Sequence, residues 1–234
     1  MTQTRAVRAV FLDAGYTLLR VEPSTGHHYA AAGREIAGFE AEPDAYDRMF
    51  GRAMAEALTD EFAPSPEVDD ESERTRWRRF TSRLYGAMGL VDGHEALWIR
   101  LERVYTDPRT WVPFEDTVPL LDALDERGIA AVIVSNWTTH LRRILEHHGL
   151  LPRMAAMIGS CEVGVEKPDP RIFGLALRAL DIRPEQAIHV GDSVAADVEG
   201  ARAAGIRPLL LDRQRRYPDH PDRIDGLLEI LDRL

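Results

Sequence analysis

The amino-acid sequence predicts an α/β fold, in which a doubly wound parallel sheet forms the core and an all-helical domain is inserted into it. Two observations support this prediction. Short apolar runs alternate with helical patterns along the C-terminal half of the chain, as expected for parallel strands joined by crossover helices. More than 100 residues between the first and second of these runs carry helical patterns and no strand pattern.

Five runs have the length and the apolar composition of buried strands. They are Ala6–Leu12, Ala130–Val134, Met157–Ser160, Ala187–Val190 and Pro208–Leu211. From the second strand onward, helical patterns precede or follow each run. These predicted helices are Thr117–Glu126, Thr139–His148, Pro170–Leu180 and Ala195–Ala204. The third of them follows Asp169, which with Pro170 forms the N-cap and N1 pair that starts a helix.

The long segment between the first two strands is too large for a simple crossover. We predict that residues 21–112 form a separate helical domain and that residues 1–20 and 113–234 form the core. The hinges would lie at Val21–Gly26 and Thr106–Glu115, which are rich in Pro and turn residues. Within the inserted domain we predict four helices, Gly26–Gly38, Pro43–Asp60, Glu71–Met88 and Gly93–Tyr105, and a loop at Ala63–Ser72.

The composition limits the classes of function. The chain has 234 residues, of which 44% are hydrophobic and 29% are charged, as in ordinary globular proteins. Its net charge of −10 argues against nucleic acid as a partner. No apolar run approaches the roughly 18 residues that a membrane-spanning helix needs. Because the first strand begins within a few residues of the N-terminus, we expect no signal peptide and a cytoplasmic location.

A single lysine stands among the 29 basic residues, and it is Lys167. Everywhere else the chain uses arginine for positive charge. An ammonium group is a compact point charge, whereas a guanidinium is a broad planar fork that does not fit a tight pocket between two anions. Lys167 is therefore a candidate for a role that arginine cannot fill.

The ends of the predicted strands bring further polar residues together. In an open parallel sheet, ligands bind beyond the carboxyl ends of the strands. Asp13 follows the first strand, and Ser135 and Asn136 follow the second. Lys167 lies near the next crossover, and Gly191-Asp192 follows the fourth strand, with Asp197 shortly after it. Four segments that deliver Asp, Ser, Lys and Asp to one crevice predict a catalytic site.

These residues resemble the four motifs of the haloacid dehalogenase superfamily. Asp13 and Thr17 match the first motif, Ser135 the second, Lys167 the third, and Gly191-Asp192 through Asp197 the fourth. The resemblance covers residues 6–20 and about 113–234, and the helical insertion lies where that family places its cap domain. It implies a Rossmann-like core with a helical cap.

The resemblance also implies a mechanism, in which Asp13 attacks phosphorus and forms an aspartyl-phosphate. Asp13, Asp192 and the backbone carbonyl of Gly15 would bind Mg²⁺, which favours carboxylates and phosphate oxygens. Lys167 and Ser135 would stabilise the phosphoryl group, while Asp197 would orient Lys167 or a metal-bound water. Thr17 and Asn136 complete the predicted catalytic set. The implied function is that of a Mg²⁺-dependent phosphatase acting on a small phosphorylated metabolite.

Gly15 departs from the pattern, because phosphatases of this family usually carry a second Asp there as general acid. Three explanations remain open. The substrate has a good leaving group, such as an aryl or acyl phosphate; Tyr16 acts as the proton donor; or the reaction is not the hydrolysis of a phosphate ester.

Alternative functions follow from the third explanation. Phosphonate-cleaving relatives use a cap lysine, which this chain lacks. Dehalogenases use the same Asp on carbon without a metal, but typically replace the motif-four Asp, which is retained here as Asp192. They also carry Tyr and Asn where this chain has Phe173 and Val194. A 2-haloacid dehalogenase-type hydrolase and a catalytically silent binding protein are therefore the alternatives. We expect His189, within a predicted strand, to belong to the core.

Overall fold

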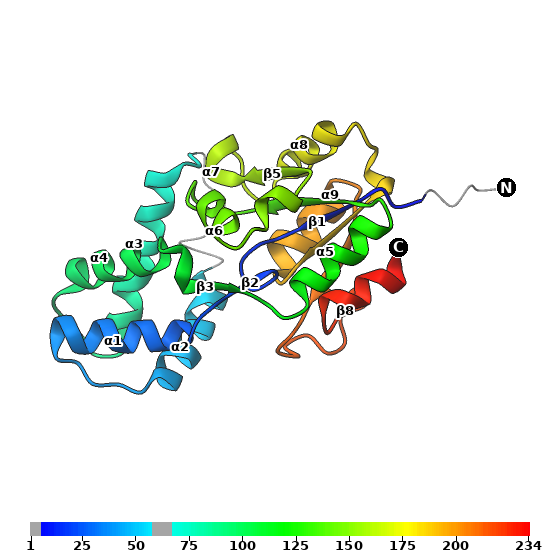
Figure 1. Cartoon of the computed structure of the whole chain (residues 1–234). Coiled ribbons are helices and arrows are strands. Elements are labelled where there is room, and N and C mark those ends of the chain that lie inside the picture. Colours follow the sequence, from blue (N-terminus) through cyan, green and yellow to red (C-terminus); the bar gives the residue numbers. More distant parts are fainter. Residues whose placement is uncertain (1–5, 58–66) are drawn as a thin grey trace. The chain divides into compact units, whose positions relative to one another are not determined.

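The computed structural model describes residues 6–57 and 67–234. The chain divides into two compact units (Figure 1). The first, which we call the core unit, consists of Met1–Arg20 and Pro113–Leu234, and the second, the helical unit, of Val21–Val112.

The core unit contains a six-stranded parallel sheet, which confirms the predicted fold class. The strand order is β5-β4-β1-β6-β7-β8, and every neighbouring pair is parallel. The strands are β1 (Ala9–Leu12), β4 (Ala130–Ser135), β5 (Ala156–Gly159), β6 (Ala187–Gly191), β7 (Arg207–Leu211) and β8 (Arg223–Ile224). The five predicted strands are present with shifted ends. The sequence gives no sign of β8, because two residues are too few to form a pattern.

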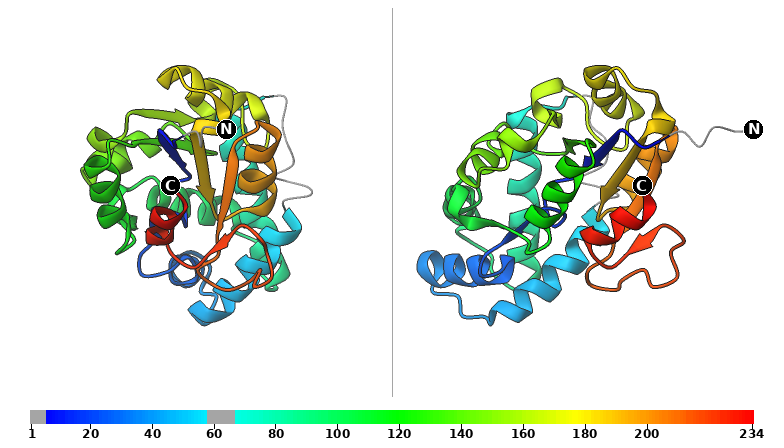
Figure 2. Two further views of the ribbon diagram at one scale, coloured as in Figure 1. Left: turned by 90° about the vertical axis from the view of Figure 1, so that its right-hand side faces the viewer. Right: turned by 45° about the vertical axis from the view of Figure 1, so that its right-hand side comes forward.

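Helices cover both faces of this sheet (Figure 2). Helix α5 contacts β4 and η5, whereas α8 contacts β4, β5 and α9. The bounds of the helices are α5 (Thr117–Glu126), α6 (Leu141–His147), η2 (Leu151–Arg153), α7 (Ser160–Val163), α8 (Pro170–Leu180), η3 (Pro184–Gln186), η4 (Val194–Glu199), α9 (Gly200–Ala203) and η5 (Leu227–Arg233). Since both faces are covered, all four residues of the central strand β1 are buried, which explains its unbroken apolar sequence.

Two predicted elements differ in detail from the structure. The predicted helix Ala195–Ala204 is a π-helical turn, η4, followed by the short helix α9. The amides of Asp197 and Val198 both donate to the carbonyl of Ser193, at 3.0 and 3.2 Å, which widens the turn. The predicted strand Met157–Ser160 ends at Gly159, because Ser160 begins α7.

The helical unit contains α1 (Thr25–Ala37), α2 (Pro43–Ala57), α3 (Asp70–Ala87), α4 (His94–Tyr105) and the short η1 (Pro108–Thr110). Their buried faces share one hydrophobic cluster, to which α1 contributes Tyr29, α2 Tyr46 and α3 Phe80 and Tyr85. These aromatic rings pack against one another with centroids 5.2–6.1 Å apart, partly through Phe50. The unit is therefore built around a core of its own.

The inserted segment and its ends differ from the prediction in three places. β2 (Leu19–Val21) and β3 (Trp111–Pro113) form a separate two-stranded sheet where no strand is predicted. Helix α1 begins at Thr25, inside the predicted hinge. Helix α3 begins at Asp70, inside the predicted loop Ala63–Ser72, because the carboxylate of Asp69 caps it by accepting from the amide of Ser72 at 2.8 Å. The end of the predicted helix Pro43–Asp60 and the start of that loop lie outside the described residues.

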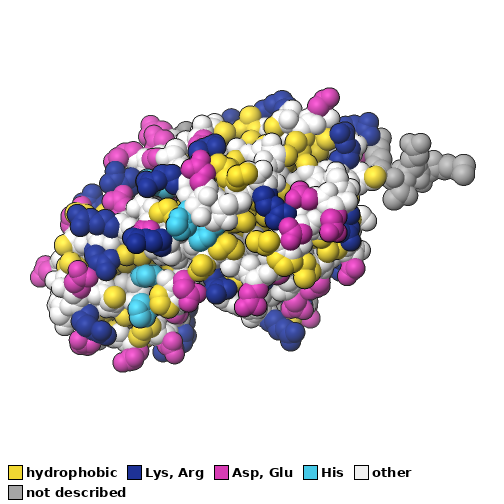
Figure 3. Space-filling model, in the orientation of Figure 1, with side chains coloured by type: hydrophobic (Ala, Val, Ile, Leu, Met, Phe, Trp, Pro, Cys, Tyr) yellow, Lys and Arg dark blue, Asp and Glu magenta, His cyan; other side chains and the backbone are white. Residues whose placement is uncertain are grey.

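Charged side chains of both signs are interspersed over the face of the molecule that Figure 3 shows. Many exposed arginines pair with a carboxylate close by, as Arg109 does with Asp107 and Arg171 with Asp169, both at 2.6 Å. Such pairs contribute little to stability in water. In the part of the chain that the structure describes, no helix combines the length and apolar composition needed to cross a membrane.

Candidate active site

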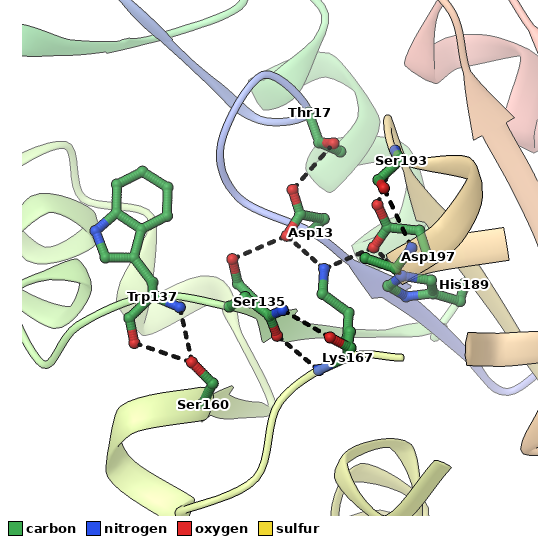
Figure 4. Close-up of polar contacts among 11 residues, drawn as sticks. Asp13, Thr17, Ser135, Trp137, Ser160, Lys167, His189, Ser193 and Asp197 are labelled. Atoms are coloured by element: carbon green, nitrogen blue, oxygen red, sulfur yellow. Dashed lines mark hydrogen bonds and ion pairs between the residues drawn. The ribbon is translucent and has the colours of Figure 1, made fainter. Parts of the chain in front are cut away.

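Three neighbouring strands of the core sheet end in polar residues. Asp13 directly follows β1, Ser135 is the last residue of β4, and Asp192 follows β6. Because β4, β1 and β6 are adjacent and parallel, their carboxyl ends lie at one edge of the sheet. Lys167 reaches the same place from the segment between α7 and α8 (Figure 4). The structure thus brings together residues from four distant parts of the sequence.

The ammonium group of Lys167 lies between two carboxylates. Nζ donates hydrogen bonds to Oδ1 of Asp13 at 2.7 Å and to Oδ1 of Asp197 at 2.6 Å. The lysine side chain is only 2% exposed. Burial lowers the pKa of Lys167, but the two carboxylates more than offset this effect and raise the pKa above its ordinary value. Lys167 therefore provides a permanent positive charge beside Asp13.

The two carboxylate oxygens of Asp13 have different surroundings. Oδ1 accepts a hydrogen bond from Oγ of Ser135 at 2.8 Å in addition to that from Lys167. Among the residues that the structure describes, Oδ2 accepts one long hydrogen bond, of 3.4 Å, from Oγ1 of Thr17. Oδ1 is therefore held firmly, whereas Oδ2 keeps lone pairs for a cation or an electrophile.

Asn136 binds the backbone of Lys167 and not the reacting groups. Its Oδ1 accepts from the amide of Lys167 at 2.7 Å, and its Nδ2 donates to the carbonyl of the same residue at 2.9 Å. This paired contact fixes the point from which the lysine side chain extends. These two contacts are consistent with a positioning role for Asn136, and its predicted membership of the catalytic set stays a prediction.

Both carboxylate oxygens of Asp197 are occupied. Oδ1 accepts from Nε2 of His189 at 2.8 Å as well as from Lys167, and Oδ2 accepts from the amide of Ser193 at 3.0 Å. Burial raises the pKa of Asp197, but Lys167 and His189 outweigh it and bring the pKa below the ordinary carboxyl value. A Cβ atom at Gly191 would lie 2.1 Å from Cγ of Asp197. Glycine at this position therefore lets the carboxylate reach Lys167.

Asp13, Asp192 and Asp197 form an acidic cluster in which each residue offers one oxygen within 4.8 Å of the others. Asp197 already accepts three hydrogen bonds, so Asp13 and Asp192 are the carboxylates better placed to bind a cation. Burial and the charges of Asp13 and Asp197 raise the pKa of Asp192 to about 7. The guanidinium of Arg216, 3.6 Å away, compensates only in part. A hard divalent cation fits this donor set, which consists of oxygen atoms and carries uncompensated negative charge.

A family model described as haloacid dehalogenase-like hydrolase matches residues 7–205, a range that includes all three carboxylates and Lys167. The chain belongs to this family.

Known proteins similar to this family member include both curated relatives and solved structures. Haloacid dehalogenase-like hydrolase domain-containing protein 3 of Bos taurus is 30% identical over 213 residues, which are 90% of this chain and 84% of that protein. Phosphoserine phosphatase of Thermus thermophilus is 36% identical over 134 residues, 55% of this chain and 54% of that protein. The crystal structure of a haloacid dehalogenase-like phosphatase from Thermococcus onnurineus has 25% identity, a TM-score of 0.61 and 97% coverage of both chains.

In this haloacid dehalogenase-like hydrolase, the residue two positions after Asp13 packs against a tryptophan. A Cβ atom at Gly15 would lie 2.9 Å from Cζ3 of Trp137, too close unless the ring moved. Trp137 is held at its backbone, because its amide donates to Oγ of Ser160 at 3.0 Å. Tyr16 is the residue that could donate a proton in place of an aspartate at position 15. It has a positive φ of 56° and is 38% exposed. The ring of Trp137 would therefore have to shift to admit an aspartate at position 15.

The sequence indicates most, but not all, of the residues that shape this site. His189 is buried as expected, yet it also binds Asp197. A polar residue in a strand that ends at the catalytic edge is the signal that could have indicated this contact. Arg216 follows β7, the fifth predicted strand, after which the sequence predicts no site residue.

Proposed function

We propose that the chain is a Mg²⁺-dependent phosphatase that hydrolyses a small phosphorylated metabolite through an aspartyl-phosphate on Asp13. One observation carries this proposal: Asp13 accepts hydrogen bonds from Lys167 and Ser135 through one oxygen, and its carboxylate also belongs to an acidic cluster with Asp192. A nucleophile, two donors for phosphoryl oxygens and a cation site are thereby combined in one place.

The proposed reaction has two steps. Oδ2 of Asp13 attacks the phosphorus, the bond from phosphorus to the leaving-group oxygen breaks, and the leaving group departs with the electron pair and takes a proton from water. Water then attacks the phosphorus of the aspartyl-phosphate and gives a proton to the hydroxide that the first step left. The bond to Asp13 breaks, inorganic phosphate is released, and the carboxylate is restored.

The remaining residues stabilise charge or hold these groups in place. Lys167 and the hydroxyl of Ser135 would donate to phosphoryl oxygens as negative charge shifts in the transition state. Thr17 contacts the attacking carboxylate oxygen and would limit its rotation. Asn136 and Asp197 would act through Lys167, the first by binding its backbone and the second by binding Nζ.

Asp13, Asp192 and the backbone carbonyl of Gly15 would hold Mg²⁺. Two carboxylates and a carbonyl are the ligand types that Mg²⁺ takes while keeping several waters. The raised pKa of Asp192 fits this assignment, because it reflects burial together with the negative charges of Asp13 and Asp197. The bound ion would supply positive charge against which an anionic nucleophile can approach an anionic phosphoryl group.

The names of the relatives support phosphate esters as the substrate class. Both the Thermus thermophilus relative and the Thermococcus onnurineus structure are phosphatases by name. The presence of Asp192 disfavours the dehalogenase alternative, because an additional carboxylate without a cation would repel a haloacid substrate. We further propose that the helical unit at residues 21–112 is the cap that selects the substrate.

The proposal can be tested with p-nitrophenyl phosphate, whose leaving group hardly needs a proton. Wild type and Asp13→Asn would be assayed with Mg²⁺ and with EDTA. We expect turnover that needs both the metal and the Asp13 carboxylate, together with incorporation of ³²P into wild-type protein from a labelled phosphate ester.

Three results would contradict the proposal. Turnover that persists in Asp13→Asn would exclude Asp13 as the nucleophile. Absence of phosphate release by the wild type, with chloride release from 2-chloropropionate in its place, would establish the dehalogenase. If neither reaction occurred, the silent binding protein would become the favoured interpretation.

A further inference from the structure

The loop that follows β7 is firmly anchored by a buried carboxylate. Asp212, 1% exposed, accepts from the amides of Arg216 and Tyr217, both at 2.8 Å. It also accepts from Nε of Arg223 on β8 at 3.2 Å. The backbone at Arg215 adopts a positive φ of 54°, which turns the chain between these contacts. The backbone position of Arg216 is therefore fixed by the core sheet.

The side chain of Arg216, in contrast, is held loosely. Its guanidinium lies 3.6 Å from Oδ2 of Asp192, which is an ion-pair distance but too long for a hydrogen bond. The side chain is 49% exposed, and its other recorded contact is with the ring of Tyr217, 5.8 Å from the ring centroid. Among the described residues, Asp192 is the carboxylate partner of this guanidinium. Most of its five N–H donors therefore face solvent at the edge of the acidic cluster.

We propose that Arg216 forms a second anion subsite, which binds a carboxylate or a second phosphate of the substrate beside the phosphoryl group on Asp13. This inference rests on the proposed function and narrows its substrate class to phosphorylated compounds with an additional negative group.

The chemistry of the cluster explains why the guanidinium would be available. A divalent cation on Asp13 and Asp192 would neutralise the charge that attracts Arg216 and would itself repel the guanidinium. The guanidinium would then pair with the nearest anion supplied by the ligand. Its planar fork matches a carboxylate or a phosphate with two parallel hydrogen bonds.

Arg215 provides a matched control for Arg216. It is the neighbouring residue in the same loop and carries the same charge, but it pairs with Asp225 at 3.6 Å and is 77% exposed. Arg215→Gln removes the same charge from the same loop as Arg216→Gln. A general electrostatic effect of the loop would therefore appear in both variants, whereas a subsite would appear in only one.

The test measures binding of non-hydrolysable phosphonates by calorimetry in the presence of Mg²⁺. Phosphonoacetate and 3-phosphonopropionate carry a carboxylate at two spacings, and methylphosphonate and ethylphosphonate lack it. We expect wild type to bind at least one carboxylated probe about tenfold more tightly than its counterpart without the carboxylate. This preference should fall below about threefold in Arg216→Gln and persist in Arg215→Gln.

Several outcomes would overturn the subsite. Wild type that binds no probe, or shows no preference for the carboxylated ones, would do so. A preference for carboxylated probes that survives in Arg216→Gln would show that other groups bind the carboxylate. A preference that disappears equally in Arg215→Gln would show a general electrostatic effect of the loop. The turnover assay of p-nitrophenyl phosphate separates this failure from that of the proposed function, since that substrate carries no second anion.

Discussion

Two cations in the core unit bind carboxylates in opposite ways. Lys167, 2% exposed, places one nitrogen between oxygens of two different residues, Asp13 and Asp197. Arg213, 22% exposed, directs two nitrogens at the two oxygens of a single residue, Asp116, at 3.0 and 2.8 Å. It also donates to the carbonyl of Thr17 at 3.1 Å and lies 3.9 Å from the centroid of the Phe114 ring.

The difference shows what each side chain contributes. The point charge of Lys167 leaves Oδ2 of Asp13 free to react, because it occupies only Oδ1. The fork of Arg213 uses both oxygens of Asp116, and one of these also accepts from the amide of Leu227 at 2.9 Å. Together, the contacts of Arg213 and Asp116 connect the loop after β1, the start of α5 and η5. In the function that we propose, the lysine supports the reactivity of Asp13, whereas the arginine joins segments of the fold.

The exchange of lysine for arginine at the reactive site should have the largest effect. In Lys167→Arg, a guanidinium would have to occupy a space in which one nitrogen lies 2.7 and 2.6 Å from two oxygens. It would displace Asp13 or Asp197, and we expect kcat for p-nitrophenyl phosphate to fall on the order of 10³-fold. Circular dichroism would verify the fold of the variant. Activity within tenfold of wild type would show that only the charge of Lys167 matters.

The reverse exchange should affect stability more than catalysis. In Arg213→Lys, the ammonium cannot bind both oxygens of Asp116, the carbonyl of Thr17 and the ring of Phe114 together. We expect the free energy of unfolding to fall by about 2 kcal/mol, a charged hydrogen-bonded contact being worth that much. Urea denaturation would measure it, with Arg215→Lys as the exposed control. An unchanged midpoint would contradict the connecting role of Arg213.

Asn136 should have a smaller effect, because it acts on Lys167 through the backbone. Asn136→Ala removes both hydrogen bonds to the backbone of Lys167. We expect kcat to fall about tenfold, as is typical when a residue that orients a reactive group is removed. The binding constant of methylphosphonate should change less than kcat, because the charge of Lys167 remains. Equal losses in both would indicate that the whole site collapses.

The same residues show how much of the fold and of the candidate site the sequence predicts. The lone Lys167 and the polar ends of three strands indicate the centre of the site, because parallel topology brings strand ends together regardless of their separation in sequence. The fold class is predicted for the same reason, since buried strands and crossover helices have distinct patterns. Strand ends are therefore the part of the site that a sequence reveals best.

Contacts that depend on exact side-chain direction could not be predicted. Asn136 follows Ser135 in sequence, yet its amide turns to the backbone of Lys167. The contacts of Arg213 depend on how the chain returns after β7, where β8 has only two residues. The packing of Trp137 on Gly15 joins segments more than 100 residues apart and leaves no mark on periodicity.

The pH dependence of stability should distinguish the Asp116–Arg213 contact from a simple packing interaction. Burial raises the pKa of Asp116, but the hydrogen bonds from Arg213 and from the Leu227 amide outweigh it and lower the pKa. The ionised carboxylate therefore stabilises the fold above the carboxyl pKa of the unfolded chain, about 4. That stabilisation is lost as pH falls through the lower pKa of the folded state. The free energy of unfolding of wild type should exceed that of Asp116→Asn by about 1 kcal/mol at pH 7. The two values should converge at acid pH, as urea titrations at several pH values would show. A constant difference at every pH would mean that the shape of Asp116, and not its charge, holds Arg213.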